Sequence, residues 1–253
     1  MKRETKTPFL KVKFEEMGQV VIGLIGAMDA EIAQFLDEMR DIKVEEYGGI
    51  TYHQGILEGK QVVVAKTGVG KVNAALCTSI LIERYQVKMI LFTGVAGALH
   101  PELGIGDIVI SKEAQQHDVD AHSLGFTPGT IPFQETSIFP ADSRLVALAE
   151  QAAQEVTEGK VITGKILSGD QFISDPEAVA RLRERFHGVC VEMEGAAVAH
   201  VCHLFQTPFV IIRSMSDRAD QSANVNFAEF TELAAQRSGA MVRRILASLP
   251  ATW

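Results

Sequence analysis

The chain has 253 residues, of which 47% are hydrophobic, and its 24 basic and 32 acidic side chains give a net charge of −8 at pH 7. That length suits one large α/β domain or two small ones, and the hydrophobic fraction suits a packed globular protein rather than a disordered one. The acidic balance, without a long run of either sign, argues against a nucleic-acid or anionic-membrane surface, because both surfaces need basic patches.

The chain ends and the cysteines suggest a cytoplasmic protein. Residues 1–19 mix charges and lack the apolar core of a signal peptide, so we expect an N-terminal extension, a candidate for disorder, before a single domain at 20–253. Cys77, Cys190 and Cys202 are odd in number, lie in apolar contexts and lack metal-ligand spacing, which is typical of reduced, buried thiols. The longest apolar runs are well short of the ~20 residues that a membrane-spanning helix needs.

Strands and helices alternate along the whole chain. Short continuous apolar runs predict strands buried on both faces of a sheet, and apolar positions three or four apart predict the helices between them. The expected strands cover two or three segments within 47–66 and residues 20–25, 89–93, 104–111, 161–167, 189–191 and 209–212. The expected helices begin near residues 28, 72, 142, 176, 195 and 227. The pattern predicts an α/β domain without internal repeat or linker.

Some local patterns allow a structural as well as a functional interpretation. Glu31 lies in the first turn of its helix, where a carboxylate can simply complement the helix dipole. The glycine turn at 67–70 lacks phosphate-loop spacing, and a turn that packs a helix close to the sheet is the favoured interpretation. His200 and His203 have no carboxylate partner on their helix face and are interpreted as structural. The irregular, rather apolar segment 117–140 favours a pocket wall or a subunit contact.

Residues 189–217 predict a strand, a helix and a second strand around which the other segments are organised. Ligands of parallel sheets bind beyond the carboxyl ends of the strands. The strand ends here carry Glu192, Glu194, Arg213, Ser214, Ser216 and Asp217, and the segments 28–31, 93–98 and 168–173 are expected beside them. Several carboxylates without a nucleophile motif or metal spacing suit acid–base chemistry on a neutral organic ligand, as in glycoside hydrolysis. The residue types alone leave the ligand open.

Motifs in one known order are spread over most of the chain. They read I-G-L-I-G-A-M-D-A-E at 22–31, T-G-V-G-K-V-N-A-A at 67–75, T-G-V-A-G-A-L at 93–99, G-D-I-V-I-S at 106–111, S-G-D-Q-F-I at 168–173, V-E-M-E-G-A-A-V-A-H-V at 191–201 and R-S-M-S-D at 213–217. In these motifs the chain resembles the nucleoside phosphorylase superfamily and, within it, the 5′-methylthioadenosine/S-adenosylhomocysteine nucleosidases. Ordered motifs of this number are far more specific than one glycine loop.

The resemblance implies a three-layer α/β/α fold around a twisted, mostly parallel or mixed sheet, and an N-glycosidase of methionine salvage that needs no cofactor or metal. Glu31 would activate the attacking water, Asp217 would protonate N7 of adenine, and Glu194 would hold the ribose hydroxyls. The other implied pocket residues are Met193 under the sugar, Phe172 stacked on adenine with the backbone of Ile173 at its edge, Ser216 and Arg213 beside Asp217 or the sugar, and Phe227 and Met28 in the wall. The resemblance also implies a homodimer in which the partner subunit supplies an apolar slot for the 5′-alkylthio group from Ala121, Leu124, Phe126 and Pro132.

The sequence departs from the family pattern in ways that leave alternatives open. Val95 stands where many relatives have Ser, so one hydroxyl contact near the water or the ribose is missing, and Leu124 replaces an aromatic residue common in the dimer loop, which bears on the 5′-substituent preference. The sequence leaves the preference open among methylthioadenosine, S-adenosylhomocysteine, 5′-deoxyadenosine and 6-amino-6-deoxyfutalosine. A phosphorolytic relative would carry arginines in the first glycine turn and before Thr93, and none stands there, which favours water as nucleophile. A non-catalytic nucleoside-binding protein would be expected to lack one of the three implied carboxylates.

Overall fold

The computed structural model describes residues 20–217, 219, 223–250 and 253, and the predicted extension at 1–19 lies outside the described residues. The described strands are β1 (Val21–Gly26), β2 (Arg40–Tyr47), β3 (Ile50–Leu57), β4 (Lys60–Lys66), β5 (Met89–Ala98), β6 (Ile108–Gln116), β7 (Ile138–Pro140), β8 (Val161–Ser168), β9 (Gly188–Glu192) and β10 (Phe209–Asp217). The α-helices are α1 (Asp29–Glu38), α2 (Lys71–Glu83), α3 (Ser143–Val156), α4 (Pro176–Phe186), α5 (Gly195–Phe205) and α6 (Ala223–Ser248). None of these helices is long and apolar enough to cross a membrane.

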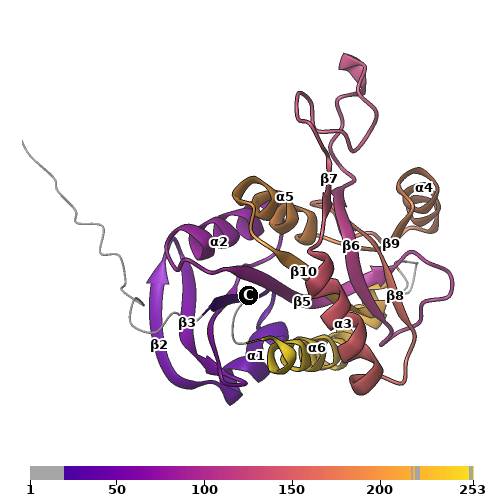
Figure 1. The fold of residues 1–253 in the computed structure, drawn as a ribbon. Coiled ribbons are helices and arrows are strands. Elements are labelled where there is room, and N and C mark those ends of the chain that lie inside the picture. Colours follow the sequence, from indigo (N-terminus) through magenta and orange to yellow (C-terminus); the bar gives the residue numbers. More distant parts are fainter. Residues whose placement is uncertain (1–19, 218, 220–222, 251–252) are drawn as a thin grey trace, which may run out of the picture.

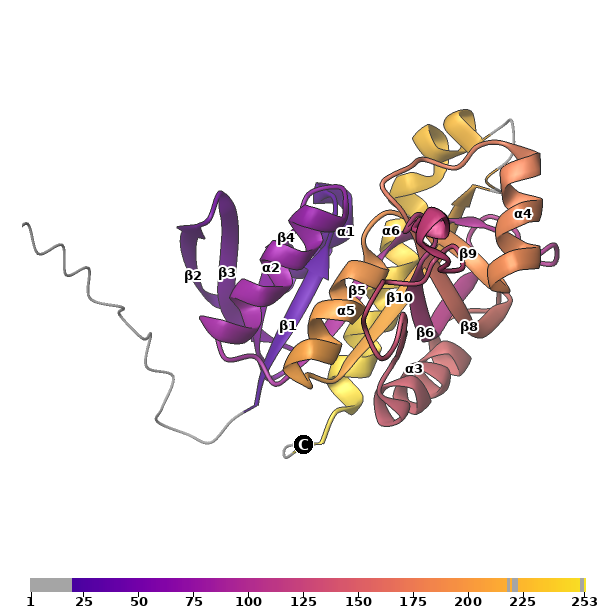
Figure 2. The same ribbon diagram turned by 90° about the horizontal axis from the view of Figure 1, so that it is seen from above.

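Helices cover both faces of one sheet (Figures 1 and 2). α2 and α5 lie side by side on one face, whereas α1, α3 and α6 cover the other face. α4 lies at the outer side of the sheet beside β9. This arrangement confirms the predicted α/β class and its layers of helix, sheet and helix.

β5 lies at the centre of the sheet and joins its two parts. It pairs in parallel with β1 and β10, and its last residues pair antiparallel with β9. From β10 the path runs through β6, β8 and β9 back to β5, so these described strands close on themselves, while β1, β4, β3 and β2 continue as an open arm. The mixed sheet agrees with the prediction. Its barrel-like closure was not predicted, because it depends on pairing between strands far apart in the chain.

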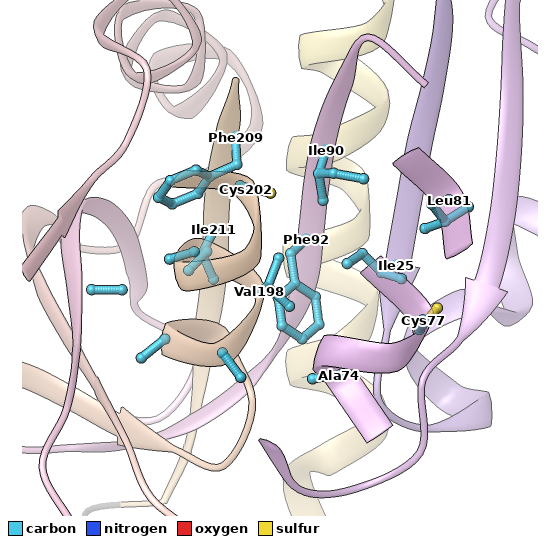
Figure 3. Close-up of a cluster of buried hydrophobic side chains, with 14 of the residues drawn as sticks. Ile25, Ala74, Cys77, Leu81, Ile90, Phe92, Val198, Cys202, Phe209 and Ile211 are labelled. Carbon is cyan, nitrogen blue, oxygen red and sulfur yellow. The ribbon is translucent and has the colours of Figure 1, made fainter. Parts of the chain in front are cut away.

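Alternation along the buried strands divides the core into two parts. In β1, Ile22 and Leu24 point to the side of α1, α3 and α6, whereas Ile25 points to the side of α2 and α5. Figure 3 shows the second side, where Phe92 of β5 lies between Cys77 of α2 and the helix α5. Each such side chain contributes about 1.5–3 kcal/mol when it is fully buried, which explains why these strands are apolar on both faces.

Two helices begin where their capping residues predict. The side chain of Asp142 accepts hydrogen bonds from the first backbone N–H groups of α3. Asp175 does the same for α4, and Pro176 occupies the first turn, where the missing N–H of proline costs nothing. α6 begins at Ala223, before the predicted start at Phe227.

The segment from 117 to 137 leaves the body of the molecule (Figure 1). It contains the short 3₁₀ helix η1 (His122–Leu124) and returns through β7, which pairs with β6. The side chain of Leu124 is 68% exposed and that of Phe133 is 91% exposed. The prediction of a long, irregular and rather apolar segment is therefore confirmed, and two of its apolar residues, Leu124 and Phe133, are exposed.

Candidate active site

The candidate site is a pocket at the carboxyl ends of β1, β5, β8, β9 and β10. Among the described residues, the predicted ones that line it are Met28, Glu31, Val95, Phe172, Ile173, Met193, Glu194, Ser216, Asp217 and Phe227. Glu192, Ala96, Gly97 and Gln171, which belong to the predicted strand ends, also line the pocket, and the residues outside the predicted strand ends are Ala27, Val69 and Val191. Strand ends far apart in the chain thus meet as predicted.

Glu31 reaches the pocket from the first turn of α1. One carboxylate oxygen accepts hydrogen bonds from the backbone N–H groups of Ala27 at 2.5 Å and Met28 at 3.0 Å, and the other accepts from Val95 at 3.0 Å. Only 2% of Glu31 is exposed. Burial raises the pKa of Glu31, and this outweighs the opposing effects of the Arg213 charge and of the three amides. The carboxylate therefore binds N–H groups at the start of its own helix and also an N–H group of β5. The helix-dipole interpretation accounts for the first of these contacts but not for the second.

Glu194 is held by the glycine turn at 67–70. The backbone N–H of Gly70 donates to Glu194 Oε1 at 2.8 Å, and Val69 lines the pocket next to it. Burial, followed by the nearby charge of Glu192, raises the pKa of Glu194 to about 8. The turn therefore belongs to the site, and its interpretation as helix packing alone was incomplete.

Glu192 and Arg213 form a buried ion pair behind the pocket. Arg213 Nη2 lies 2.6 Å from Glu192 Oε2, and its guanidinium carbon lies 3.9 Å from the centre of the Phe92 ring. The Glu192 carboxylate also accepts hydrogen bonds from Ser168 Oγ and from the backbone N–H of Gly195, at the N-terminus of α5. Arg213 was predicted beside Asp217 or the sugar; among the described residues its ion pair is with Glu192.

Glu192 was predicted to lie at the end of a strand, but no role was predicted for it. The sequence does contain a signal for such a role, because a carboxylate directly before a helix can accept hydrogen bonds from the free N–H groups of the first turn. What the sequence could not indicate is that Arg213, from the neighbouring part of the barrel, would meet this carboxylate.

Asp217 ends β10 where the register of its pairing with β5 shifts between Met215 and Asp217. Such an irregularity re-aims side chains, and Ser216 and Asp217 both line the pocket. Ser216 Oγ donates to Asp217 Oδ2 at 2.8 Å, and the backbone N–H of Ala219 donates to Oδ1 at 2.7 Å. A Cβ atom on Gly97 would lie 2.9 Å from Asp217 Oδ1, so glycine is required for this close approach.

Two phenylalanines, Phe172 and Phe227, form the aromatic part of the pocket, and Met28 lies among the other apolar residues of its lining. Phe172 and Phe227 meet edge to face, with ring centres 5.6 Å apart, and Phe172 remains 46% exposed. Met28 packs with Val95 of β5 and with Phe227, Ala234 and Ala235 of α6. A flat heterocycle fits beside such rings, and the carboxylates opposite them can bind hydroxyl groups or transfer protons.

The residues predicted to come from a partner subunit lie elsewhere in this chain. They belong to the projecting segment and are not among the described residues that line this pocket, namely Ala121, Leu124, Phe126 and Pro132. Among the described residues, no group of three or more His, Cys, Asp or Glu side chains has the geometry to hold a metal ion.

Comparisons with known proteins agree over nearly the whole chain. The family model described as Phosphorylase superfamily matches residues 21–247. The 5′-methylthioadenosine/S-adenosylhomocysteine nucleosidase of Bacillus cytotoxicus is 43% identical over 229 residues, which are 90% of this chain and 99% of that protein. The nucleosidase of the same name from Neisseria meningitidis, solved with methylthio-immucillin-A, is 40% identical with a TM-score of 0.87, and the match covers 90% of this chain and 99% of that one.

A solved structure with another name is similar to the same degree. The futalosine hydrolase of Helicobacter pylori strain 26695 is 36% identical with a TM-score of 0.87, and the match covers 91% of this chain and 98% of that one. The carboxylate-lined pocket at the strand ends, the mixed sheet and these similarities lead to one conclusion. The chain belongs to the phosphorylase superfamily and, within it, to the family of 5′-methylthioadenosine/S-adenosylhomocysteine nucleosidases.

Proposed function

We propose that this chain hydrolyses the N-glycosidic bond of 5′-methylthioadenosine and S-adenosylhomocysteine, releasing adenine and the thioribose. The observation that carries the proposal is the convergence of Glu31, Glu194 and Asp217, all nearly buried, on one pocket with an aromatic wall. Cleavage of such a bond passes through a cationic, oxocarbenium-like sugar, and carboxylates stabilise that charge while they move protons. The reaction belongs to methionine salvage and to the removal of S-adenosylmethionine by-products.

Glu31 is the proposed general base that activates water. Its burial raises its pKa above the ordinary value, so the carboxylate is a stronger base than an exposed glutamate. The three amides that hold it fix its orientation before the ligand arrives. The positive charge of Arg213 opposes this rise in the pKa of Glu31.

Asp217 is the proposed general acid that protonates N7 of the leaving adenine. Neutral adenine is a far better leaving group than its anion, and a general acid contributes about 10²–10⁴-fold in rate. Ser216 Oγ and the Ala219 amide hold the two carboxylate oxygens. We infer that water exclusion by the bound nucleoside favours the protonated form of this carboxyl group.

The remaining pocket residues bind the sugar and the base in this proposal. Glu194 accepts hydrogen bonds from the 2′- and 3′-hydroxyls, and Met193 lies under the sugar ring. Phe172 stacks on adenine, and the backbone of Ile173 reads its edge. The Gly70 amide supports the position of Glu194, because it already holds one of its oxygens.

Water is favoured over phosphate as the nucleophile. A phosphate dianion needs charge-assisted donors, and none of the described residues that line the pocket is Lys or Arg. Arg213, the cation behind the pocket, is engaged with Glu192.

The test is adenine release from methylthioadenosine by the purified protein, in phosphate-free buffer and again with added phosphate. We expect adenine and free methylthioribose at the same rate in both buffers. Release that requires phosphate and yields a sugar 1-phosphate would move the assignment to a phosphorylase. Absence of adenine in both buffers would favour another nucleoside or a non-catalytic binding protein.

A second hydrolytic substrate is 6-amino-6-deoxyfutalosine, and the similarity to a futalosine hydrolase favours its inclusion. The same purine and ribose contacts serve this nucleoside, because it differs at the 5′-substituent. Competition assays among methylthioadenosine, S-adenosylhomocysteine, 5′-deoxyadenosine and aminodeoxyfutalosine rank the four by kcat/KM. A ranking with aminodeoxyfutalosine far above the others would change the biological role while it left the chemistry unchanged.

We also propose that the active form is a homodimer in the cytoplasm. The outer face of α2 carries the exposed side chains of Val72 and Leu76, and α5 beside it carries Leu204 and Phe205. Together with the projecting segment these side chains make an apolar surface of the kind that subunit contacts bury. In the dimer, Ala121, Leu124, Phe126 and Pro132 of the partner subunit close the 5′-side of the pocket. The free, buried cysteines are compatible with a reducing compartment.

Val72→Glu tests the dimer, because it puts a charge on this apolar surface at a residue that is 79% exposed. We expect monomers in sedimentation and a loss of activity, since the 5′-slot is then missing. Val44→Glu is the matched control, because Val44 is similarly exposed but lies on the edge strand β2. Val72→Glu protein that stays dimeric, or that keeps full activity as a monomer, would contradict the proposal.

A further inference from the structure

A closed ring of interactions joins the start of α2 to two loops at the rim of the pocket. The backbone N–H of Lys71 donates to Asp170 Oδ1 at 2.8 Å, and the backbone N–H of Asp170 donates to Asp118 Oδ2 at 3.0 Å. The Lys71 ammonium closes the ring by an ion pair with Asp118 Oδ1 at 2.6 Å. We call these residues, Lys71, Asp118 and Asp170, the rim ring.

The Lys71–Asp118 ion pair of the rim ring is largely shielded from water, whereas Asp170 is exposed. The side chain of Lys71 is 17% exposed and that of Asp118 is 15% exposed, unlike the surface ion pairs of this chain. Lys71 Nζ also donates to Gln116 Oε1 at 3.1 Å, which fixes the ammonium at the end of β6. Burial raises the pKa of Asp118, but the Lys71 ammonium and the Asp170 amide outweigh burial and leave that pKa lowered. An ion pair of this kind restrains geometry more strongly than an exposed pair does.

Each member of the ring lies next to a segment that bears on the pocket, and Lys71 is the first residue of α2. Lys71 directly follows Gly70, whose amide holds Glu194. Asp170 directly precedes Gln171 and Phe172, which line the pocket. Asp118 lies at the start of the projecting segment, next to the end of β6. None of the three ring residues is among the described residues that line the pocket, so they act on it through their neighbours.

We propose that Lys71, Asp118 and Asp170 are positioning residues that hold the ribose side and the base side of the pocket in register before the nucleoside binds. The kinetic test of this proposal rests on the proposed nucleosidase function. Without the ring, the 169–173 loop and the 67–70 turn move independently, and only a fraction of molecules has a binding-competent pocket. The apparent affinity then falls by that fraction, while the chemical step in bound molecules changes little.

The first variant is Lys71→Met, which keeps the aliphatic stem and removes the ammonium. We expect KM for methylthioadenosine to rise about tenfold with kcat within about threefold of the unchanged protein. The dissociation constant of adenine alone, measured by calorimetry, should rise by a similar factor. Lys71→Arg, which restores a donor to Asp118, should recover most of the loss, and a purely structural role would not produce this split.

Lys160→Met is the matched control. It breaks an ion pair with Glu102 of similar length, 2.8 Å, at the amino-terminal end of β8, and both side chains there are exposed. It should leave KM, kcat and the adenine affinity unchanged. Asp118→Asn removes the negative charge of the same ion pair and is the second variant, to be used if Lys71→Met does not fold.

Hydrogen exchange separates this proposal from the proposed function. In the ligand-free proteins, the segments 67–72 and 168–174 should exchange faster in Lys71→Met and Asp118→Asn than in the unchanged chain, with no difference in β1. If the unchanged protein hydrolyses no nucleoside, the proposed function is wrong. The hydrogen exchange rates and the adenine affinities would still test whether the rim ring holds the two sides of the pocket in position. Unchanged exchange with unchanged adenine affinity and KM in both variants would overturn the proposal, as would a fall in kcat alone.

Discussion

At the scale of single residues, the site is governed by one buried cation among several carboxylates. Arg213 is 1% exposed, pairs directly with Glu192, and acts through its charge on Glu31 and Glu194. The Glu192 carboxylate forms the ion pair with Arg213 and accepts hydrogen bonds from the backbone N–H of Gly195 at the start of α5. The pKa values of Glu31 and Glu194, in contrast, are both raised. Burial is the main cause of both shifts, and for Glu194 the nearby negative charge of Glu192 adds to it, whereas the Arg213 charge opposes both.

Glu31→Gln should lower kcat by about 10²–10⁴-fold, because the amide cannot accept a proton from water. The pH profile of the unchanged protein gives a second check. Glu31 must be ionised to act, and its pKa is raised above 4.5, so activity should fall on acidification at a pH above 4.5. Stopped or continuous assays of adenine release from pH 4 to 9 measure both effects. Full hydrolysis by Glu31→Gln would reduce Glu31 to a helix-capping role.

Asp217→Asn should abolish leaving-group protonation while it preserves the shape of the pocket. We expect kcat to fall at least about a hundredfold with KM changed far less. The Ser216 hydroxyl can rotate toward the new amide, so the pocket should stay assembled and still bind adenine in calorimetry. Normal turnover in Asp217→Asn would remove the acid assignment.

At the scale of elements, close approach between β5 and its neighbours decides where the functional groups meet. Gly94 of β5 has no room for a larger residue, because its Cβ would lie 2.7 Å from both Arg213 Nη1 and Glu31 Oε1. The strand is therefore part of the site even where it supplies only backbone. The Val95 amide next to it binds Glu31 directly.

Gly94→Ala should displace Arg213 and Glu31 together. Overpacking of this kind costs about 1–3 kcal/mol of stability, so the melting temperature should fall by several degrees, and kcat should fall at least tenfold because the base is moved. Circular dichroism during heating and the adenine assay measure the two effects. Full activity with an unchanged melting temperature would show that β5 accommodates a Cβ atom at Gly94 without displacing Arg213 or Glu31.

At the scale of the whole molecule, the site is kept at a cost in stability. Burial, with the Glu192 charge, raises the pKa of Glu194 to about 8, so the folded state binds a proton more tightly than the unfolded chain does. A raised pKa contributes stability below the unfolded value, near 4.5, and this contribution is lost as the pH rises through about 8. The ligand-free protein should therefore be less stable at alkaline pH.

Glu194→Gln tests this cost, because the amide stays neutral at every pH. We expect melting temperatures close to those of the unchanged protein at pH 5 and several degrees higher at pH 8.5, together with weaker nucleoside binding. Glu58→Gln, in the exposed turn between β3 and β4, is the control and should show no such difference. A difference that shrinks as the pH rises would contradict the assigned direction of the pKa shift.

The sequence by itself determined much of the local structure and most of the pocket, although the strand β2 (Arg40–Tyr47) lies before the strands expected within 47–66. Continuous apolar runs such as residues 20–25 and 209–212 predicted the buried strands, since a strand covered on both faces admits few polar residues. The rule that ligands bind at strand ends predicted a common site for Glu194 and Asp217. The one-domain organisation and the roles of these residues remain predictions.

Only the tertiary structure decided which distant groups touch. The closure of the sheet through β5 and β10, the pair between Glu192 and Arg213, and the rim ring that includes Lys71 all join segments far apart in the chain. Periodicity and capping signals report on neighbours within one or two turns of the same element, so they hold no information about such pairs. The partner of a buried charge is set by packing, and packing is a property of the folded molecule.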